Sequence, residues 1–139
     1  MEVVKAVIFK KGEYLLQLRD DNPLISFPNT WSFFGGEVDI NESLLEALKR
    51  ELFEELAWSP QISKNIRKIR YEKPACNITF YLIECNISDD KFSLGEGQEM
   101  AWFTYDEILN FSLLSDFKQS LVSKESLFAI NSLTSKTYL

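Results

Sequence analysis

Apolar and polar residues are distributed along this chain with two periods, and these periods predict where strands and helices lie. Val3–Phe9 is apolar and β-branched, and a Lys-Lys-Gly turn separates it from Glu13–Arg19. The two segments therefore predict a β-hairpin. Further strands are expected in four apolar or aromatic segments, which are Trp31–Phe34, Ile66–Glu72, Ile78–Ile87 and Met100–Phe103.

Two polar stretches interrupt this pattern and are expected to be loops. Asp20–Thr30 contains Pro23 and Pro28, and it is long enough to be a binding loop rather than a plain connection. Asp89–Gly97 is polar and contains glycine, which also predicts a loop.

Glu42–Leu56 is predicted to be the main helix, because its leucines recur at helical spacing and form one apolar stripe. Asp39 or Asn41 is expected to cap the start of this helix. Pro60 prevents any long continuation beyond its end.

Two more helical segments are expected near the end of the chain. Thr104–Glu107 matches a capping box and predicts a helical turn, and Leu113–Leu121 predicts a closing helix. The order of strands and helices predicts one domain over residues 1–139, of the α/β or the α+β class. In this domain a mixed β-sheet is flanked by helices, as an α/β/α sandwich.

Composition and charge narrow the function classes. The 139 residues contain 15 basic and 21 acidic side chains, a net charge of −6 without a basic stripe, so we expect no nucleic-acid polymer as partner. The chain has no histidine, which excludes Ser-His-Asp and Cys-His catalysis and histidine-ligated zinc. Acid–base chemistry is left to carboxylates, lysine, tyrosine or metal-bound water.

The cysteines and the N-terminal segment predict a cytoplasmic protein. Cys76 and Cys85 lie in an apolar stretch without a Cys-x-x-Cys pair, so we expect buried free thiols in a reducing compartment. The N-terminal segment does not have the pattern of a signal peptide. No apolar run approaches the roughly 18 residues that a membrane span needs, so no membrane partner is expected.

Three glutamates crowd the end of the main helix. Glu51, Glu54 and Glu55 share one helical face at a C-terminus that is already negative, where each misplaced charge costs about 0.3–1 kcal/mol. One explanation is a solvated acidic face, with Arg50 paired to Glu46 or Glu54. The other is a bound hard dication, because Mg²⁺ and Mn²⁺ prefer carboxylate oxygens and also bind phosphates.

The residues around these glutamates favour the second explanation. Gly36 is followed after five residues by Glu42, and after seven more by the run Arg50-Glu51-Leu52-Phe53-Glu54-Glu55-Leu56-Ala57-Trp58. This pattern resembles the signature of the Nudix hydrolases, Gly-x5-Glu-x7-Arg-Glu-U-x-Glu-Glu-x-Gly-U, where U is bulky and apolar. Every fixed position matches except one, because Ala57 stands where the family has glycine.

The resemblance extends to roughly residues 3–120. The hairpin, the loop and the aromatic strand leading into Gly35-Gly36 are similar to MutT-type members, as is Tyr71-Glu72-Lys73-Pro74 before an apolar strand. Glu96-Gly97-Gln98 resembles the loop that supplies an additional metal-binding glutamate in that group, with Glu99 as the competing candidate.

The resemblance implies roles for particular residues. It implies that carboxylates and one main-chain carbonyl bind the metal, and the matching residues are Glu51, Glu54, Glu55, Glu96 and Gly36. It implies that Arg50 orients Glu51, that Glu42 and Gly35 support the site, and that Glu51 or a neighbouring carboxylate helps to deprotonate the attacking water.

The reaction that the resemblance implies is hydrolysis of a nucleoside diphosphate linked to another group, with Mg²⁺, or Mn²⁺ in its place, as cofactor. The expected substrate is a (deoxy)nucleoside triphosphate, cut to the monophosphate and pyrophosphate. The alternatives are an ADP-ribose or nucleotide-sugar pyrophosphatase and a non-catalytic nucleotide-sensing domain. The expected partner is this nucleotide or derivative, and the expected state is a monomer or homodimer.

Several aromatic and charged residues are candidates for substrate recognition. Phe27 and Trp31, like Phe33 and Trp102, are stacking candidates for a base, although aromatic residues near a sheet are more often core residues. Asp116 is a base-contact candidate or a helix-terminal charge, and Arg19 is a phosphate-contact candidate, as is Lys10.

Ala57 carries a separate expectation. A helix-ending glycine normally adopts a left-handed conformation, in which alanine costs about 1 kcal/mol. The sequence therefore predicts either a different helix end or a strained turn, with no metal ligand lost.

Overall fold

A computed structural model describes residues 1–24, 30–74, 76–85, 92–95, 99–110 and 124–135. The strands are β1 Glu2–Lys10, β2 Glu13–Leu18, β3 Trp31–Ser32, β4 Phe34–Glu37, β5 Lys68–Glu72, β6 Asn77–Glu84 and β7 Glu99–Thr104. The helices are α1 Leu44–Leu56, α2 Tyr105–Asn110 and α4 Lys124–Ser135. The predicted helix Leu113–Leu121 lies outside the described residues.

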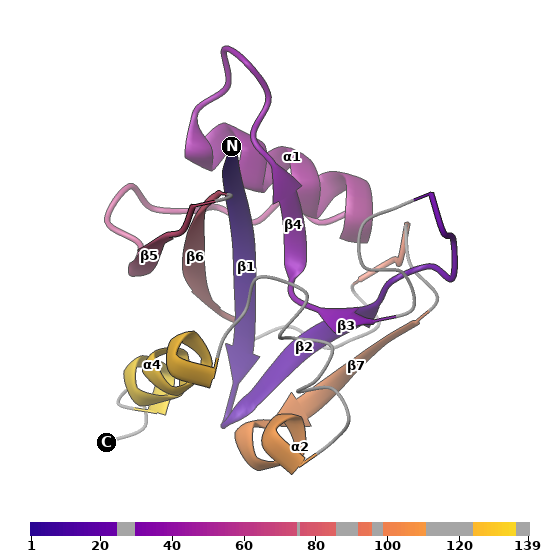
Figure 1. Ribbon diagram of the computed structural model, residues 1–139, viewed down its shortest axis with the longest axis vertical. Helices are drawn as coiled ribbons and strands as arrows, with labels where there is room; N and C mark the ends of the chain where they lie inside the picture. Colours follow the sequence, from indigo (N-terminus) through magenta and orange to yellow (C-terminus); the bar gives the residue numbers. More distant parts are fainter. Residues whose placement is uncertain (25–29, 75, 86–91, 96–98, 111–123, 136–139) are drawn as a thin grey trace.

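The described strands form one mixed sheet (Figure 1). Its main path runs β3-β2-β1-β6-β5, while β4 also pairs with β1 and β7 with β2. The β1–β6 pair is parallel and the other pairs are antiparallel. The predicted hairpin is confirmed by the pairing of Phe9 with Tyr14.

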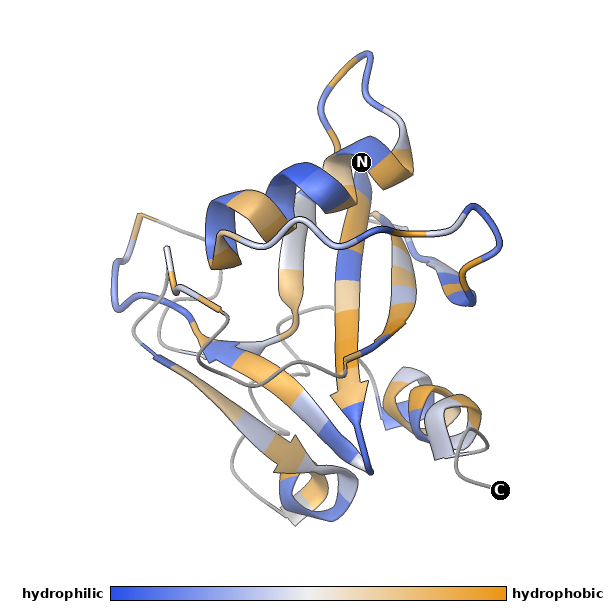
Figure 2. Ribbon diagram, turned by 180° about the vertical axis from the view of Figure 1, so that it is seen from behind, coloured by the Kyte–Doolittle hydropathy of each residue, from blue (hydrophilic) through white to orange (hydrophobic). Residues whose placement is uncertain are grey.

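Two apolar clusters cover the two faces of the sheet, which confirms the predicted flanking by helices. On one face, Val4, Ala6 and Leu15 pack with the leucine stripe of α1. On the other face, Val7 and Phe9 pack with residues of α2 and α4. Figures 1 and 2, which show opposite sides, place α1 on one side of the sheet and α4 on the other.

The predicted cap of the main helix is wrong. Ser43, rather than Asp39 or Asn41, caps α1, because its hydroxyl accepts the Glu46 N–H at 3.1 Å while Glu46 Oε1 accepts the Ser43 N–H at 2.9 Å. This reciprocal pair satisfies two main-chain donors at once, which a single side chain at position 39 or 41 cannot do. The second predicted capping box, at Thr104 and Glu107, is confirmed.

The predicted single strand Trp31–Phe34 is also wrong, because the chain changes partners within it. Trp31 and Ser32 pair with β2, whereas Phe34 and the two glycines after it pair with β1. Phe33, between the two strands, is fully buried against Tyr14 and Phe80. The switch brings Gly35 and Gly36 into the middle of the sheet.

The thiols of Cys76 and Cys85 are buried and free, as predicted. Among the described residues, no helix combines the length and the apolar character that crossing a bilayer requires.

Candidate active site

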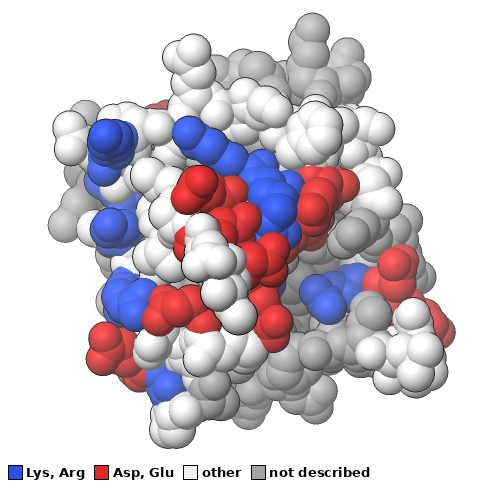
Figure 3. Space-filling view, turned by 90° about the horizontal axis from the view of Figure 1, so that it is seen from above, with Lys and Arg blue, Asp and Glu red and all other residues white. Residues whose placement is uncertain are grey.

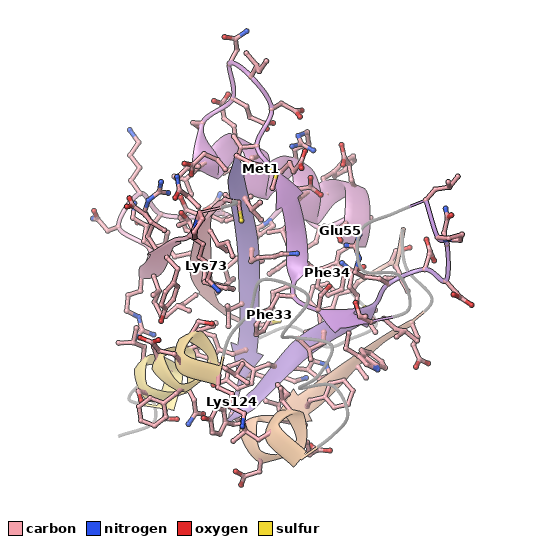
Figure 4. All side chains as sticks on the ribbon, in the orientation of Figure 1. Met1, Phe33, Phe34, Glu55, Lys73 and Lys124 are labelled. Atoms are coloured by element: carbon pink, nitrogen blue, oxygen red, sulfur yellow. The ribbon has the colours of Figure 1, made fainter. Side chains whose placement is uncertain are left out.

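The three glutamates at the end of α1 occupy three different environments. Glu54 is about half exposed, with 47% of its side chain accessible, and Glu51 is mostly covered, with 12% accessible. Glu55 is buried, at 3% exposure, against the sheet. Figure 4 shows Glu55 at the C-terminal end of α1, near Phe34 of β4.

Glu55 is held by two strands at once. The main-chain N–H of Gly35 donates to Glu55 Oε1 at 2.9 Å, and Gln17 Nε2 of β2 donates to Oε2 at 2.5 Å. Burial raises the pKa of the Glu55 carboxyl to about 8, although the charge of Lys5 and these two hydrogen bonds act in the opposite direction.

Gly35 is required by this arrangement. Its φ of 142° is a value that other residues rarely adopt. A Cβ at this position would lie 2.1 Å from the Val4 carbonyl oxygen of the neighbouring strand. Only glycine therefore lets the main chain present its N–H to Glu55 here.

Arg50 joins three acidic side chains of the motif. Its guanidinium donates to both carboxylate oxygens of Glu42, at 2.7 and 3.0 Å, and Nη1 donates to Glu51 Oε1 at 3.0 Å and to Glu54 Oε2 at 3.5 Å. Nη2 also donates to the Glu37 carbonyl at 3.0 Å. Figure 3, which looks onto this end of the molecule, shows acidic side chains gathered around basic ones.

These contacts shift the pKa values of both partners. The bidentate pair with Arg50 and the N–H of Asp39 lower the pKa of Glu42 to about 2. The same pair, together with Glu51, raises the pKa of Arg50 above its ordinary value. Within the Glu42–Arg50–Glu51 relay, the Glu42–Arg50 pair therefore remains charged at neutral pH.

Gly36 lies directly against the carboxylate of Glu51. A Cβ on Gly36 would lie 2.5 Å from Glu51 Oε1 and 2.8 Å from its carboxyl carbon, so any side chain there would displace the carboxylate. The donor set at this point consists of carboxylate oxygens beside a glycine main chain. This set suits a hard dication such as Mg²⁺ or Mn²⁺.

The carboxylates do not converge on one point. Within the part of the chain that the structure describes, no three His, Cys, Asp or Glu side chains form a group ready to hold a metal ion. Glu51 and Glu54 share one nitrogen of Arg50, and Glu55 is turned toward the sheet. Glu51, Glu54 and Glu55 are neighbours on the helix, as predicted, but Glu55 lies on the side of α1 that faces the sheet.

Helix α1 ends in the strained turn that its sequence predicts as one of two outcomes. Ala57 is left-handed, with φ 50° and ψ 38°, and its N–H still bonds to the Phe53 carbonyl at 2.9 Å. A loop before β7 satisfies two further carbonyls, because Ser93 N–H donates to Leu56 and Gly95 N–H donates to Glu55. The main-chain carbonyls of Phe53, Glu55 and Leu56 in the last turn of α1 therefore accept hydrogen bonds from protein N–H groups.

Two buried polar residues of the site are missed by sequence reasoning. Lys5 is 8% exposed, its Nζ donates to the Phe33 carbonyl at 3.4 Å, and burial lowers its pKa. Gln17 is 2% exposed and contacts Glu55. The available signal is a charged or amide side chain inside an otherwise apolar strand, because such a residue must find a partner when buried.

The candidate residues for substrate binding lie in different parts of the sheet, and some of them are outside the described residues. Trp31 packs edge-on against Phe103, with ring centroids 4.9 Å apart, and Phe33 is a core residue. Lys10 lies 4.2 Å over the ring of Trp102, at the hairpin end of the sheet. Arg19 is half-buried, and its positive charge contributes to the lowered pKa of Lys5. Phe27, Glu96 and Asp116 lie outside the described residues.

The sequence matches the NUDIX domain family over residues 2–123. The chain therefore belongs to the Nudix family, and it is a pyrophosphohydrolase of the Nudix type. Among curated proteins it is similar to the nucleoside triphosphatase NudI of Escherichia coli O139:H28. The two are 28% identical over 126 residues, a match that covers 80% of this chain and 86% of that protein.

Solved structures show the same fold. The MutT protein of Methanosarcina mazei Go1 superposes with a TM-score of 0.68 at 23% identity, over 96% of this chain and 94% of that one. An Ap4A hydrolase of C. elegans superposes with a TM-score of 0.66 at 22% identity, over 98% and 97% of the two chains. These neighbours confirm the expected α+β architecture.

Proposed function

We propose that this chain is a metal-dependent hydrolase that cuts a (deoxy)nucleoside triphosphate to the monophosphate and pyrophosphate. The observation that carries the proposal is the Glu42–Arg50–Glu51 relay, which holds the Glu51 carboxylate against the main chain of Gly36. The choice of a triphosphate is supported by the similarity to NudI, whose name is nucleoside triphosphatase.

The residues that would hold Mg²⁺, or Mn²⁺ in its place, are the carboxylates of Glu51, Glu54, Glu55 and Glu96 with the carbonyl of Gly36. When bound, the dication supplies positive charge against the phosphates and lowers the pKa of the attacking water. Because the chain contains no histidine, we assign the role of proton acceptor to the carboxylates of the same site.

The chain's own residues orient these carboxylates. Arg50 presents two nitrogens to Glu42 and one to Glu51, and this fork fixes the guanidinium plane and the rotamer of Glu51. Gly35 leaves room for strand β4 to approach Val4 and to donate to Glu55. We assign Glu42 and Gly35 to this supporting role.

Substrate contacts are assigned to residues around the site. Arg19, which directly follows the last residue of β2, is the proposed phosphate contact. Trp31, Phe27 and Asp116 are the proposed base contacts.

Glu54→Gln tests the proposal. The variant removes the most exposed of the three carboxylate charges and keeps its shape. We therefore expect nucleotide turnover with Mg²⁺ to fall at least about a hundredfold, while the thermal unfolding midpoint stays close to that of the natural protein.

Glu46→Gln is the matched control, because Glu46 lies on the same helix and glutamine can still complete the capping box. This control should keep its turnover. Full activity of Glu54→Gln would overturn the metal assignment. Release of products from ADP-ribose or a nucleotide sugar, but not from triphosphates, would replace the proposed substrate by the alternative one.

A further inference from the structure

Gln17 is an amide side chain in an apolar layer. It is 2% exposed, and it lies in β2 opposite Ser32 of β3 and Met100 of β7. Alternation along β2 places it on the same sheet face as Leu15, which packs in the cluster of α1. A buried amide there needs a specific partner, because burying it without one costs about 1–3 kcal/mol.

That partner is Glu55. Gln17 Nε2 donates to Glu55 Oε2 at 2.5 Å, while the Gly35 N–H donates to the other oxygen, Oε1, at 2.9 Å. The two donors come from different strands, so together they fix both the position of the carboxylate and its rotation. Each carboxylate oxygen has about two acceptor sites, so one site on each oxygen is left for a further ligand.

A second observation points to a polar ligand at the same place. Ser32 is 2% exposed, and among the described residues its hydroxyl is the buried side-chain atom for which no hydrogen-bond partner is found. Ser32 lies directly opposite Gln17, and directly opposed residues of an antiparallel pair share one face of the sheet. The sheet face on which Gln17 contacts Glu55 therefore carries one amide that is hydrogen-bonded and one hydroxyl, that of Ser32, for which no partner is found in the described part of the chain.

We propose that Gln17 is a positioning residue for metal binding, which acts by holding the carboxylate of Glu55 in the orientation that a dication requires. This inference rests on the proposed function, which assigns Glu55 to the metal. Gln17 does not touch the metal or the substrate in this scheme. Its effect reaches them only through Glu55.

Gln17→Met tests the inference, since methionine has a similar length and no donor. Mn²⁺ alone serves as the probe, and its binding to the protein without nucleotide is followed by electron paramagnetic resonance. Loss of a residue that orients a metal ligand typically weakens metal binding 10- to 100-fold, and we expect a decrease of this size.

Tyr14→Phe is the matched control. Tyr14 lies on the same strand but in the opposite cluster, and its hydroxyl contacts Thr134 and Asn131 of α4. The variant therefore also removes a buried hydrogen bond from β2, but on the face of the sheet opposite α1. Its Mn²⁺ affinity should stay within about twofold of the natural value, even if its unfolding midpoint falls as much as that of Gln17→Met.

A second measurement separates positioning from a loss of folding. Gln17→Met introduced into Glu55→Gln should cause little further loss of Mn²⁺ affinity, because the two residues act as one unit. Natural affinity in Gln17→Met, or a full additional loss in the double variant, would overturn the inference. If the natural protein binds Mn²⁺ through this pair but hydrolyses no nucleotide, the proposed function fails and the inference stands. If the natural protein binds no Mn²⁺, both fail.

Discussion

At the scale of single residues, the site combines charged groups that the sequence predicts with polar groups that it does not. Glu51, Glu54, Glu55 and Arg50 are singled out as candidates by the motif and the family resemblance, and helical periodicity predicts that they are neighbours. Lys5 and Gln17 are not found, because their contacts join strands and a helix that lie far apart in the sequence. The period of a strand shows which face a residue is on, but not what lies above that face.

Ala57 shows a different limit. The sequence predicts either a changed helix end or a strained one, and the structure shows the strained one. Propensity cannot choose between these outcomes, because the choice depends on the loop that contacts the last carbonyls. Ser93 and Gly95 donate to the helix end in its present position, and these bonds compensate for the strain at Ala57.

The pKa of Glu42 leads to a prediction at the residue scale. Its folded value is about 2 and its ordinary value is 4.5, so this carboxylate contributes stability above pH 4.5 that is lost as pH falls from about 4.5 toward 2. Glu42→Gln should therefore be less stable than the natural protein at pH 6, and the difference should shrink toward pH 2. Urea unfolding at several pH values measures this, and a constant difference would contradict it.

At the scale of elements, the described strands and the main helix follow from hydrophobic periodicity, whereas their ends depend on partners. The leucine stripe correctly places the end of α1 at Leu56, but the helix begins at Leu44, two residues later than predicted, because the capping box with Glu46 selects Ser43 as the cap. The aromatic segment at Trp31 is correctly expected to be extended. Its division into β3 and β4 follows from the change of partner strand at Phe33, which local sequence does not encode.

The contact between residues 92–95 and the end of α1 predicts that this loop stabilises the protein and positions the end of the helix. A Cβ on Gly95 would lie 2.3 Å from the Glu54 carbonyl oxygen, so Gly95→Ala forces the loop away from the helix. Overpacking of this kind costs about 1–3 kcal/mol, and we also expect turnover to fall because the main chain of Glu54 and Glu55 moves.

Gly12→Ala is the control for this variant. Gly12 has a φ of 81° but nothing within 4 Å of its added Cβ, so the substitution strains the hairpin turn without touching α1. Both variants should lose stability in urea unfolding, but only Gly95→Ala should lose turnover beyond its loss of folded protein. Equal turnover in the two would show that the loop does not position the helix end.

At the scale of the whole molecule, the charge balance agrees with the proposed reaction. A chain with a formal net charge of −6 repels a polyphosphate, and Glu51 and Glu54, two of the proposed metal ligands, contribute to that charge. A bound dication reverses this local field. The absence of histidine agrees with the same account, because the proton acceptors it requires are carboxylates or water.

The proposed reaction is tested by the identity of the products released from a deoxynucleoside triphosphate. With Mg²⁺ present, the natural protein should release the monophosphate and pyrophosphate in equal amounts, and excess chelator should abolish this release. Release of the diphosphate and inorganic phosphate, or turnover that persists in chelator, would contradict the central claim that these carboxylates hold a metal for pyrophosphohydrolysis.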